Sequence, residues 1–188
     1  MTQTRSKNTR EKLLNAAMNV FYTRGISGTT LQDIAEAASV PLGNVYYHFK
    51  TKQDLIRAVI EARADELRQD FRSYEAKLEP RAALLTLVTD SRKDKKNLTK
   101  YGCPYACLTA DLREDSSDLV GEAGSLLEIW VDFATRQFKR LGKGKDSRAL
   151  AESYVSGLQG GYLLARSAGS TATLERQLNR LEEWIQGL

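Results

Sequence analysis

Residues 30–49 read TLQDIAEAASVPLGNVYYHF, and this stretch decides the fold that the sequence predicts. Thr30, followed three residues later by Asp33, is typical of a helix N-terminus, because each side chain can bond the other residue's backbone N–H. Pro41 disfavours helical backbone at Val40, so the stretch divides into two short helices. Apolar side chains form the inner stripe of the first helix: Leu31, Ile34, Ala35 and Ala38. Two short helices joined by a tight turn form a helix-turn-helix.

The second of these helices, over about residues 42–49, has two contrasting faces. Val45 and Phe49 stand four residues apart and would face the core, whereas Asn44, Tyr47 and His48 would share the opposite face. An amide can pair with adenine through two hydrogen bonds, and aromatic edges can contact thymine methyl groups. This face therefore predicts a helix that reads bases in the DNA major groove.

Phosphate partners are expected on either side of this helix. Lys50 and Lys52 follow it, and Thr51 caps a long helix whose first backbone N–H groups can receive an anion. The periodicity leaves one alternative open, a small helical bundle that binds no DNA.

Helical periodicity continues along the chain, and no alternating run or Asn-Gly turn predicts a strand. We expect an all-α protein of about nine helices, with a helix-turn-helix domain at residues 1–50 and a second domain at residues 51–188. The helices are expected at about residues 9–24, 31–38, 42–49, 52–79, 81–98, 105–113, 119–141, 146–167 and 171–186. The basic stretch 92–100 is interpreted as a solvated, frayed helix end, and an acidic loop is expected at 114–118.

The positive charge is unevenly distributed. The formal net charge is +4, and residues 1–60 contain eight Lys or Arg and four acids, whereas residues 61–188 contain 20 of each. A basic module attached to a neutral body suits a domain that meets a polyanion. The polar, basic start MTQTRSKNTR and the lack of a long apolar run predict a cytoplasmic protein without a membrane segment.

The counts of reactive residues argue against several classes of protein. With two cysteines and one histidine, a disulfide scaffold, a zinc site and a histidine-based triad are not expected. No nucleophile–base pair or phosphate-binding glycine loop indicates an enzyme, and no cofactor is expected. A helical adaptor that binds protein is a further alternative, and the basic surplus and the polar helix face argue against it.

Residues 9–60 resemble the N-terminal domain of tetracycline-repressor-type (TetR family) regulators. The matching residues are Leu14, Ala16, Ala17, Phe21, Gly25, Thr29, Thr30, Ile34, Ala35, Ala38, Val40, Gly43, Val45, Tyr46, His48, Phe49, Lys52 and Leu55. The resemblance implies an all-α homodimer. Its N-terminal domain would bind a near-palindromic DNA operator, generally as a repressor, and its C-terminal domain would bind a small effector that releases the DNA.

The resemblance also assigns roles to single positions. Residues at places that contact bases or neighbouring phosphates are Gln32, Leu42, Asn44, Tyr47 and His48, and Gly43 is expected among the DNA-binding residues as well. Residues at places that commonly contact phosphate are Thr30, Tyr46 and Lys52. One position departs from the family pattern, because Ser39 stands where glycine is usual, so the turn must tolerate a side chain there.

The last two helices are expected to form the dimer interface, in line with the resemblance and with the symmetry of palindromic operators. Small residues would allow close helix approach and larger ones would pack between them: Gly157, Gly160, Gly161, Tyr154, Leu158 and Leu164, with Leu174, Leu178, Leu181 and Ile185 on the final helix. The alternative is packing inside one chain. Aromatic residues that could line an effector cavity, or simply belong to the core, are Phe71, Tyr105, Trp130, Phe133 and Tyr162.

The two cysteines stand four residues apart, with Cys103 in an expected turn and Cys107 in the short helix that follows it. If Pro104 opens that helix, its N–H groups and the basic residues upstream would lower the pKa of the Cys103 thiol, and a redox or electrophile sensor becomes a hypothesis. The alternative is that both cysteines are small buried apolar residues.

Overall fold

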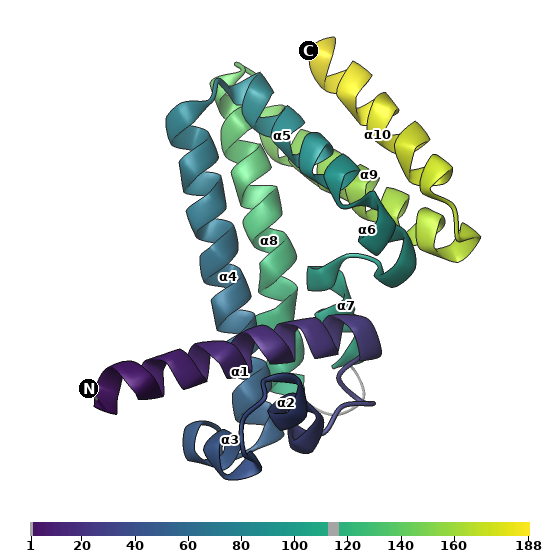
Figure 1. The fold of residues 1–188 in the computed structure, drawn as a ribbon. Helices are drawn as coiled ribbons and strands as arrows, with labels where there is room; N and C mark the ends of the chain where they lie inside the picture. Colours follow the sequence, from purple (N-terminus) through teal and green to yellow (C-terminus); the bar gives the residue numbers. More distant parts are fainter. Residues whose placement is uncertain (1, 113–116) are drawn as a thin grey trace. The chain divides into compact units, whose positions relative to one another are not determined.

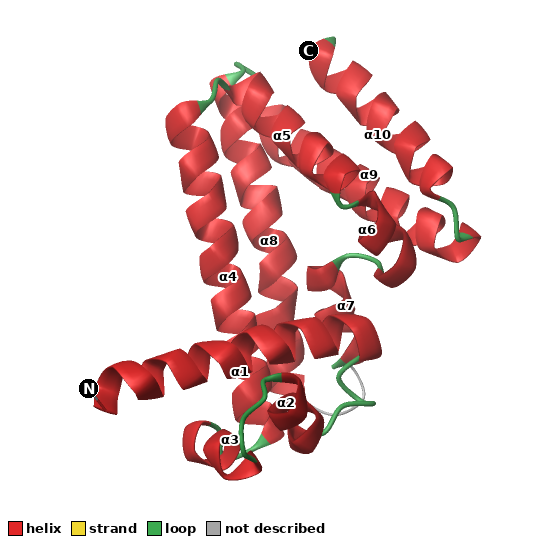
Figure 2. Cartoon of the chain, viewed as in Figure 1, coloured by secondary structure: helices red, strands yellow, loops and turns green. Residues whose placement is uncertain are grey.

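The computed structural model describes residues 2–112 and 117–188, whose course is shown in Figure 1. Within these ranges all regular structure is helical, with ten α-helices, α1 to α10, and one short 3₁₀ helix, η1 (Figure 2). The prediction of an all-α protein is confirmed. No helix in the described ranges is long and apolar enough to cross a membrane.

The chain forms two compact units, and the first comprises Met1–Asp65 and Tyr105–Gly124. Its helices are α1 (Thr2–Arg24), α2 (Leu31–Ala37), α3 (Leu42–His48) and α7 (Pro104–Asp111), with the first parts of α4 (Lys52–Lys77) and α8 (Ser117–Arg140). Apolar positions of these helices form its core: Leu13, Ala17, Phe21, Ile34, Val45, Phe49 and Leu55. Burial of such side chains is the main stabilising contribution to the unit.

The second unit comprises Glu66–Pro104 and Ser125–Leu188. It contains α5 (Pro80–Lys93), α6 (Lys95–Tyr101), η1 (Gly144–Asp146), α9 (Ser147–Ala168) and α10 (Thr171–Gln186), with the remaining parts of α4 and α8. The unit boundaries fall inside α4 and α8, which run through both units, and the functional boundary expected at residue 50 stays a prediction.

Two buried tyrosines join α9 to α5. The Tyr154 hydroxyl donates to the Leu84 carbonyl oxygen at 2.7 Å, and the Tyr162 hydroxyl lies 2.6 Å from the Ser91 hydroxyl. Burial raises the pKa of Tyr154 well above its ordinary value, so this phenol stays protonated as a donor. Both tyrosine side chains therefore belong to the core, and each hydroxyl has a hydrogen-bond partner.

Two glycines of α9 lie against α10 of the same chain. A Cβ atom at Gly157 would be 2.9 Å from Leu181 Cδ2, and one at Gly161 would be 2.9 Å from Gln177 Cγ. Leu158 is fully buried as well. Gly157, Leu158 and Gly161 thus pack inside the chain, which is the alternative to a dimer contact. Gly160 has no such neighbour, because a Cβ atom there would meet nothing within 4 Å.

The stretch 92–100 is not a frayed end. It continues from α5 into a separate helix, α6, and Arg92 Nε lies 2.6 Å from Glu175 Oε1 while Arg92 NH2 lies 2.7 Å from Glu182 Oε2. Lys95 Nζ lies 2.9 Å from Glu175 Oε2. Ion pairs with α10 therefore hold in place a segment that the sequence alone suggests is solvated. Because α6 is separate from α5, the structure has one α-helix more than the nine expected in the described residues. Of the acidic loop expected at 114–118, Ser117 and Asp118 begin α8 and the rest lies outside the described residues.

Candidate nucleic-acid interface

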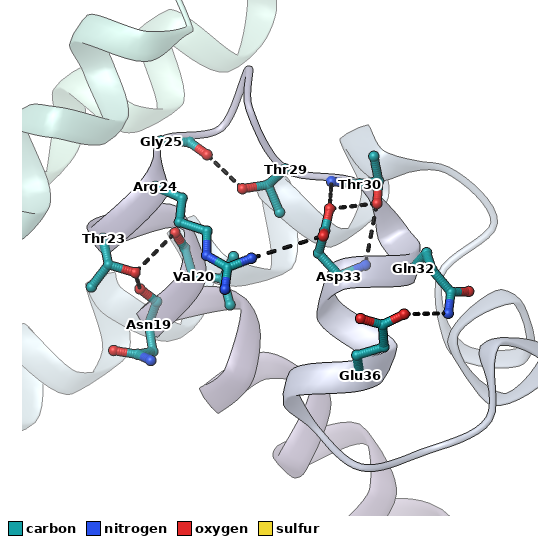
Figure 3. A network of polar contacts seen from close by, with 10 residues as sticks. All are labelled: Asn19, Val20, Thr23, Arg24, Gly25, Thr29, Thr30, Gln32, Asp33 and Glu36. Atoms are coloured by element: carbon teal, nitrogen blue, oxygen red, sulfur yellow. Dashed lines mark hydrogen bonds and ion pairs between the residues drawn. The ribbon is translucent and has the colours of Figure 1, made fainter.

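A tight turn joins α1 to α2 (Figure 3). Gly25 ends α1 with φ of 81°, a left-handed conformation that glycine adopts without steric cost, and its N–H donates to the Phe21 carbonyl oxygen at 3.0 Å. The Thr29 hydroxyl donates back to the Gly25 carbonyl oxygen at 2.6 Å. The entry to α2 is therefore fixed by the end of α1.

Thr30 and Asp33 form the predicted capping box at the start of α2 (Figure 3). The Asp33 N–H donates to Thr30 Oγ1 at 3.2 Å, and the Thr30 N–H donates to Asp33 Oδ2 at 2.7 Å. Hydrogen bonds from the Thr30 side chain and backbone, with a smaller contribution from Arg24, lower the pKa of the half-buried Asp33 carboxyl. The carboxylate is thus ionised at the positive end of the helix dipole.

The turn between α2 and α3 holds a side chain at Ser39, where the family resemblance implies glycine. Ser39 has φ of 54°, the only positive φ at a non-glycine position in the described parts of the chain. An L-residue in this conformation costs about 1–2 kcal/mol. Ser39 therefore adopts a left-handed backbone that glycine would adopt without this steric cost.

The face of α3 presents polar and aromatic groups to solvent. Val45 is fully buried and Phe49 is 3% exposed, so they anchor the helix, whereas Asn44 is exposed and Tyr47 is 71% exposed. Tyr46 is 49% exposed. The predicted division of α3 into a core face and a solvent face is what the structure shows.

His48 is less accessible than its neighbours on this face. It is half-buried, with its ring 5.0 Å from the Tyr47 ring in an edge-on arrangement. Desolvation, and secondly the positive charge of Arg10, lower the pKa of the imidazole. The free protein therefore holds His48 neutral at pH 7, as a hydrogen-bonding group without charge.

Three predicted contact residues already have partners in the chain. The Gln32 amide Nε2 donates to Glu36 Oε1 at 2.8 Å, and Lys52 Nζ donates to the Ile26 carbonyl oxygen at 2.6 Å. Thr30 is the cap of α2. An ammonium group has three donors, so Lys52 can hold Ile26 and still donate to a phosphate.

Sequence reasoning missed Asp111, on α7. Asp111 Oδ2 accepts a hydrogen bond of 3.0 Å from the Ile26 backbone N–H, 85 residues earlier in the chain. No local pattern could reveal this contact, because the pairing depends on where α7 packs in the first unit.

Three of the five aromatic residues expected at an effector site lie together in the second unit. The Phe71 and Phe133 rings stack at 4.3 Å, and the Trp130 ring stands edge-on to Phe71 at 5.7 Å. Tyr162 is bonded to Ser91, and Tyr105 belongs to the first unit, where its ring lies 6.0 Å from the Arg63 guanidinium.

A pocket of about 270 Å³ opens next to this aromatic cluster, between α4 and α8 in the second unit. It is lined by Arg68, Phe71, Arg72, Ile129, Asp132 and Arg136. The lining therefore combines an apolar floor with three guanidinium groups and one carboxylate.

The surroundings of the cysteines favour the structural alternative. Cys103 is 5% exposed and Cys107 is half-buried, so access to the sulfur atoms is limited. Among the cations expected to activate Cys103, Arg92 and Lys95 are paired with acids of α10, and Lys93 lies 2.8 Å from Asp90. The Lys100 ammonium lies 4.8 Å from the Tyr101 ring centroid.

Comparison with known proteins identifies the family. The family described as "Bacterial regulatory proteins, tetR family" matches residues 13–59, which run from α1 through α2 and α3 into α4. A relative from Pseudomonas putida, described as "Probable HTH-type transcriptional regulator ArpR", is 30% identical and the alignment covers 98% of this chain and 91% of the relative. The chain belongs to the tetR family.

Other relatives of this tetR-family chain also match it over almost its whole length. The HTH-type transcriptional regulator TtgR of Pseudomonas putida is 29% identical, with 98% of this chain and 91% of the relative covered. The crystal structure of a TetR regulatory protein from Rhodobacter sphaeroides has the same fold, with a TM-score of 0.80 and 22% identity over 92% of this chain and 96% of that one. The protein is thus a DNA-binding transcriptional regulator with a helix-turn-helix, and this family membership favours DNA binding over the DNA-free bundle.

Proposed function

We propose that this regulator is a repressor that binds a near-palindromic operator as a homodimer and leaves it when a small molecule binds the second unit. In this proposal α3 of each protomer lies in the major groove, where the Asn44 amide and the Tyr47 ring contact base edges. Lys50, Lys52 and the start of α4 contact phosphates and set the register of the helix on the duplex.

One observation carries the proposal. Among the described residues, the large apolar side chains left exposed are Tyr46 and Tyr47 on α3 and Leu163 and Leu164 on α9. Exposed apolar groups gathered in this way mark surfaces that meet another molecule. The two pairs fit the two macromolecular contacts of a dimeric repressor, DNA and a second protomer.

The dimer contact is proposed for the outer face of α9 together with α10. Leu163 is 68% exposed and Leu164 is 61% exposed. Small residues at Ser153, Ser156, Gly160 and Ser167 share the stripe of Leu164 at helical spacing and would allow close approach of a second α9. Two-fold symmetry then presents two copies of α3 to a palindromic site.

The effector is proposed to occupy the pocket between α4 and α8. The lining contains three guanidinium groups, of Arg68, Arg72 and Arg136, and one carboxylate, of Asp132, so its side chains carry more positive than negative charge. Arg136 also lies 2.7 Å from Glu75, and Asp132 lies 3.1 Å from Arg148. With Phe71 and Ile129 as an apolar floor, this pocket suits a small organic anion with an apolar body. Calorimetric titration with 2-naphthoate and with 2-naphthylmethylammonium tests the charge preference. We expect the carboxylate to bind more tightly, and to bind less tightly to Arg72→Ala than to the control Arg180→Ala.

Thiol sensing through Cys103 or Cys107 is the second hypothesis, and burial and the engaged cations argue against it. A chromogenic disulfide should label both thiols more slowly than a free thiol. Labelling of Cys103 faster than a free thiol would support the sensor hypothesis.

The experiment for the main proposal is a mobility shift with the DNA upstream of the protein's own gene. Asn44→Ala and Tyr47→Ala should each weaken specific binding by about 1–3 kcal/mol, because each removes a base contact. Gln69→Ala is the matched control, since it removes an exposed amide of α4 outside the helix-turn-helix. Equal affinity of all three variants and the parent protein would contradict the assignment.

A further inference from the structure

One peptide unit of the turn between α1 and α2 is held from two sides. The Ile26 N–H donates to Asp111 Oδ2 at 3.0 Å, and the Ile26 carbonyl oxygen accepts from Lys52 Nζ at 2.6 Å. Asp111 is the last residue of α7, and Lys52 is the first of α4. All three residues belong to the first unit, and the Ile26 side chain is buried.

The backbone beside this peptide lies close to the Asp111 carboxylate. A Cβ atom at Gly25 would lie 3.2 Å from Asp111 Oδ2, and Gly25 has a positive φ. The carboxylate of Asp111 therefore lies close to the backbone of the turn, where the positive φ favours glycine and a Cβ atom would make a tight contact.

The same turn sets the position of α2. The Ile26 carbonyl oxygen also accepts from the Thr29 N–H at 3.1 Å, and Thr29 bonds Gly25 through its hydroxyl. Thr30 follows as the cap of α2, and α2 packs against α3. A displacement of Ile26 would thus be passed to the start of α2 and then to the helix that carries Asn44 and Tyr47.

We propose that Asp111 is a positioning residue for operator binding, which holds the turn between α1 and α2 on α7. The chain runs from α6, in the second unit, through Gly102 and Cys103 directly into α7. In this proposal, a displacement of α6 that moves α7 is passed to the helix-turn-helix through this short covalent connection and the bond from Asp111 to Ile26. This inference rests on the proposed function and adds the residue through which the second unit regulates it.

The first test separates the hydrogen bond of Asp111 from its charge. Asp111→Ala removes both, Asp111→Asn removes the charge and keeps an oxygen acceptor, and Glu61→Ala removes an exposed acid from α4 of the same unit. Loss of negative charge alone should tighten DNA binding slightly. We expect Asp111→Ala to bind operator about tenfold more weakly than the parent, and Asp111→Asn to bind within about threefold of it. Equal affinity of Asp111→Ala and Glu61→Ala would overturn the proposal.

A second measurement does not depend on DNA. Amide hydrogen exchange of Ile26 should be about tenfold or more faster in Asp111→Ala than in the parent, and close to parental in Asp111→Asn and Glu61→Ala. Unchanged exchange in Asp111→Ala would overturn the contact itself. If the parent protein bound no operator, the proposed function would fail, while this measurement would still decide whether Asp111 holds the turn at Ile26.

A double-mutant cycle tests the path from α6. Gly102 has φ of 85° and ψ of −163°, so Gly102→Ala must shift the connection into α7. If that shift acts through Asp111, Gly102→Ala should weaken operator binding in the parent and add little in Asp111→Ala. Fully additive effects would show that the connection acts by another route.

Discussion

The side chains on α3 differ in how accessible they are to DNA in the free protein. Asn44 and Tyr47 are already exposed, whereas His48 is half-buried and its pKa is lowered by desolvation and by Arg10. A phosphate or an acceptor on a base edge would favour the protonated imidazole. Proton uptake by His48 can therefore accompany operator binding.

The pH dependence of His48 follows from this arrangement. Because this single histidine has a lowered pKa, its resonance in the free protein should titrate below the ordinary value of 6.5. Between 6.5 and the lowered pKa the unfolded chain binds more protons, so stability falls as the pH falls through this range. Operator binding should raise the pKa, and affinity should increase from pH 7.5 to pH 6. NMR titration of parent and His48→Gln checks this, and a pKa that DNA leaves unchanged would argue against contact.

At the scale of helices, the sequence pattern predicts those features that depend on contacts between residues close together in the chain. The capping box of Thr30 and Asp33, the stop at Gly25 and the division of α3 into two faces depend on residues a few positions apart. The positive φ at Ser39 is different, because only the resemblance to the family, in which glycine is usual at this place, draws attention to it. The separate helix α6 and the bond from Asp111 to Ile26 depend on partners about 80 residues away, so no pattern within either segment indicates them.

The packing of α9 on α10 makes a testable case at this scale. Gly161→Ala should destabilise the protein by about 1–3 kcal/mol, because the added methyl group would overlap Gln177. Gly121→Ala on α8 is the control, since its Cβ would meet nothing within 4 Å and alanine favours helix by up to about 1 kcal/mol. Chemical denaturation of both variants decides. Equal stabilisation by the two substitutions would contradict the close approach at Gly161.

For the whole molecule, the exposed leucines of α9 predict a concentration-dependent assembly. Leu164→Glu should shift sedimentation from dimer to monomer, because burial of a carboxylate in an apolar contact is costly. Gln69→Glu adds a charge at an exposed position of α4 and should leave the dimer intact. The monomeric variant should also lose most of its operator affinity, since one α3 then contacts one half-site. A dimer that survives Leu164→Glu would place the interface elsewhere.

Base reading by α3 is tested most directly by selection of bound sequences from a random DNA pool. The parent protein should select two inverted half-sites about one helical turn apart. Asn44→Ala should relax the preference at one position, repeated symmetrically in both half-sites, and leave the other positions unchanged. An identical sequence preference for parent and Asn44→Ala would contradict the placement of α3 in the major groove.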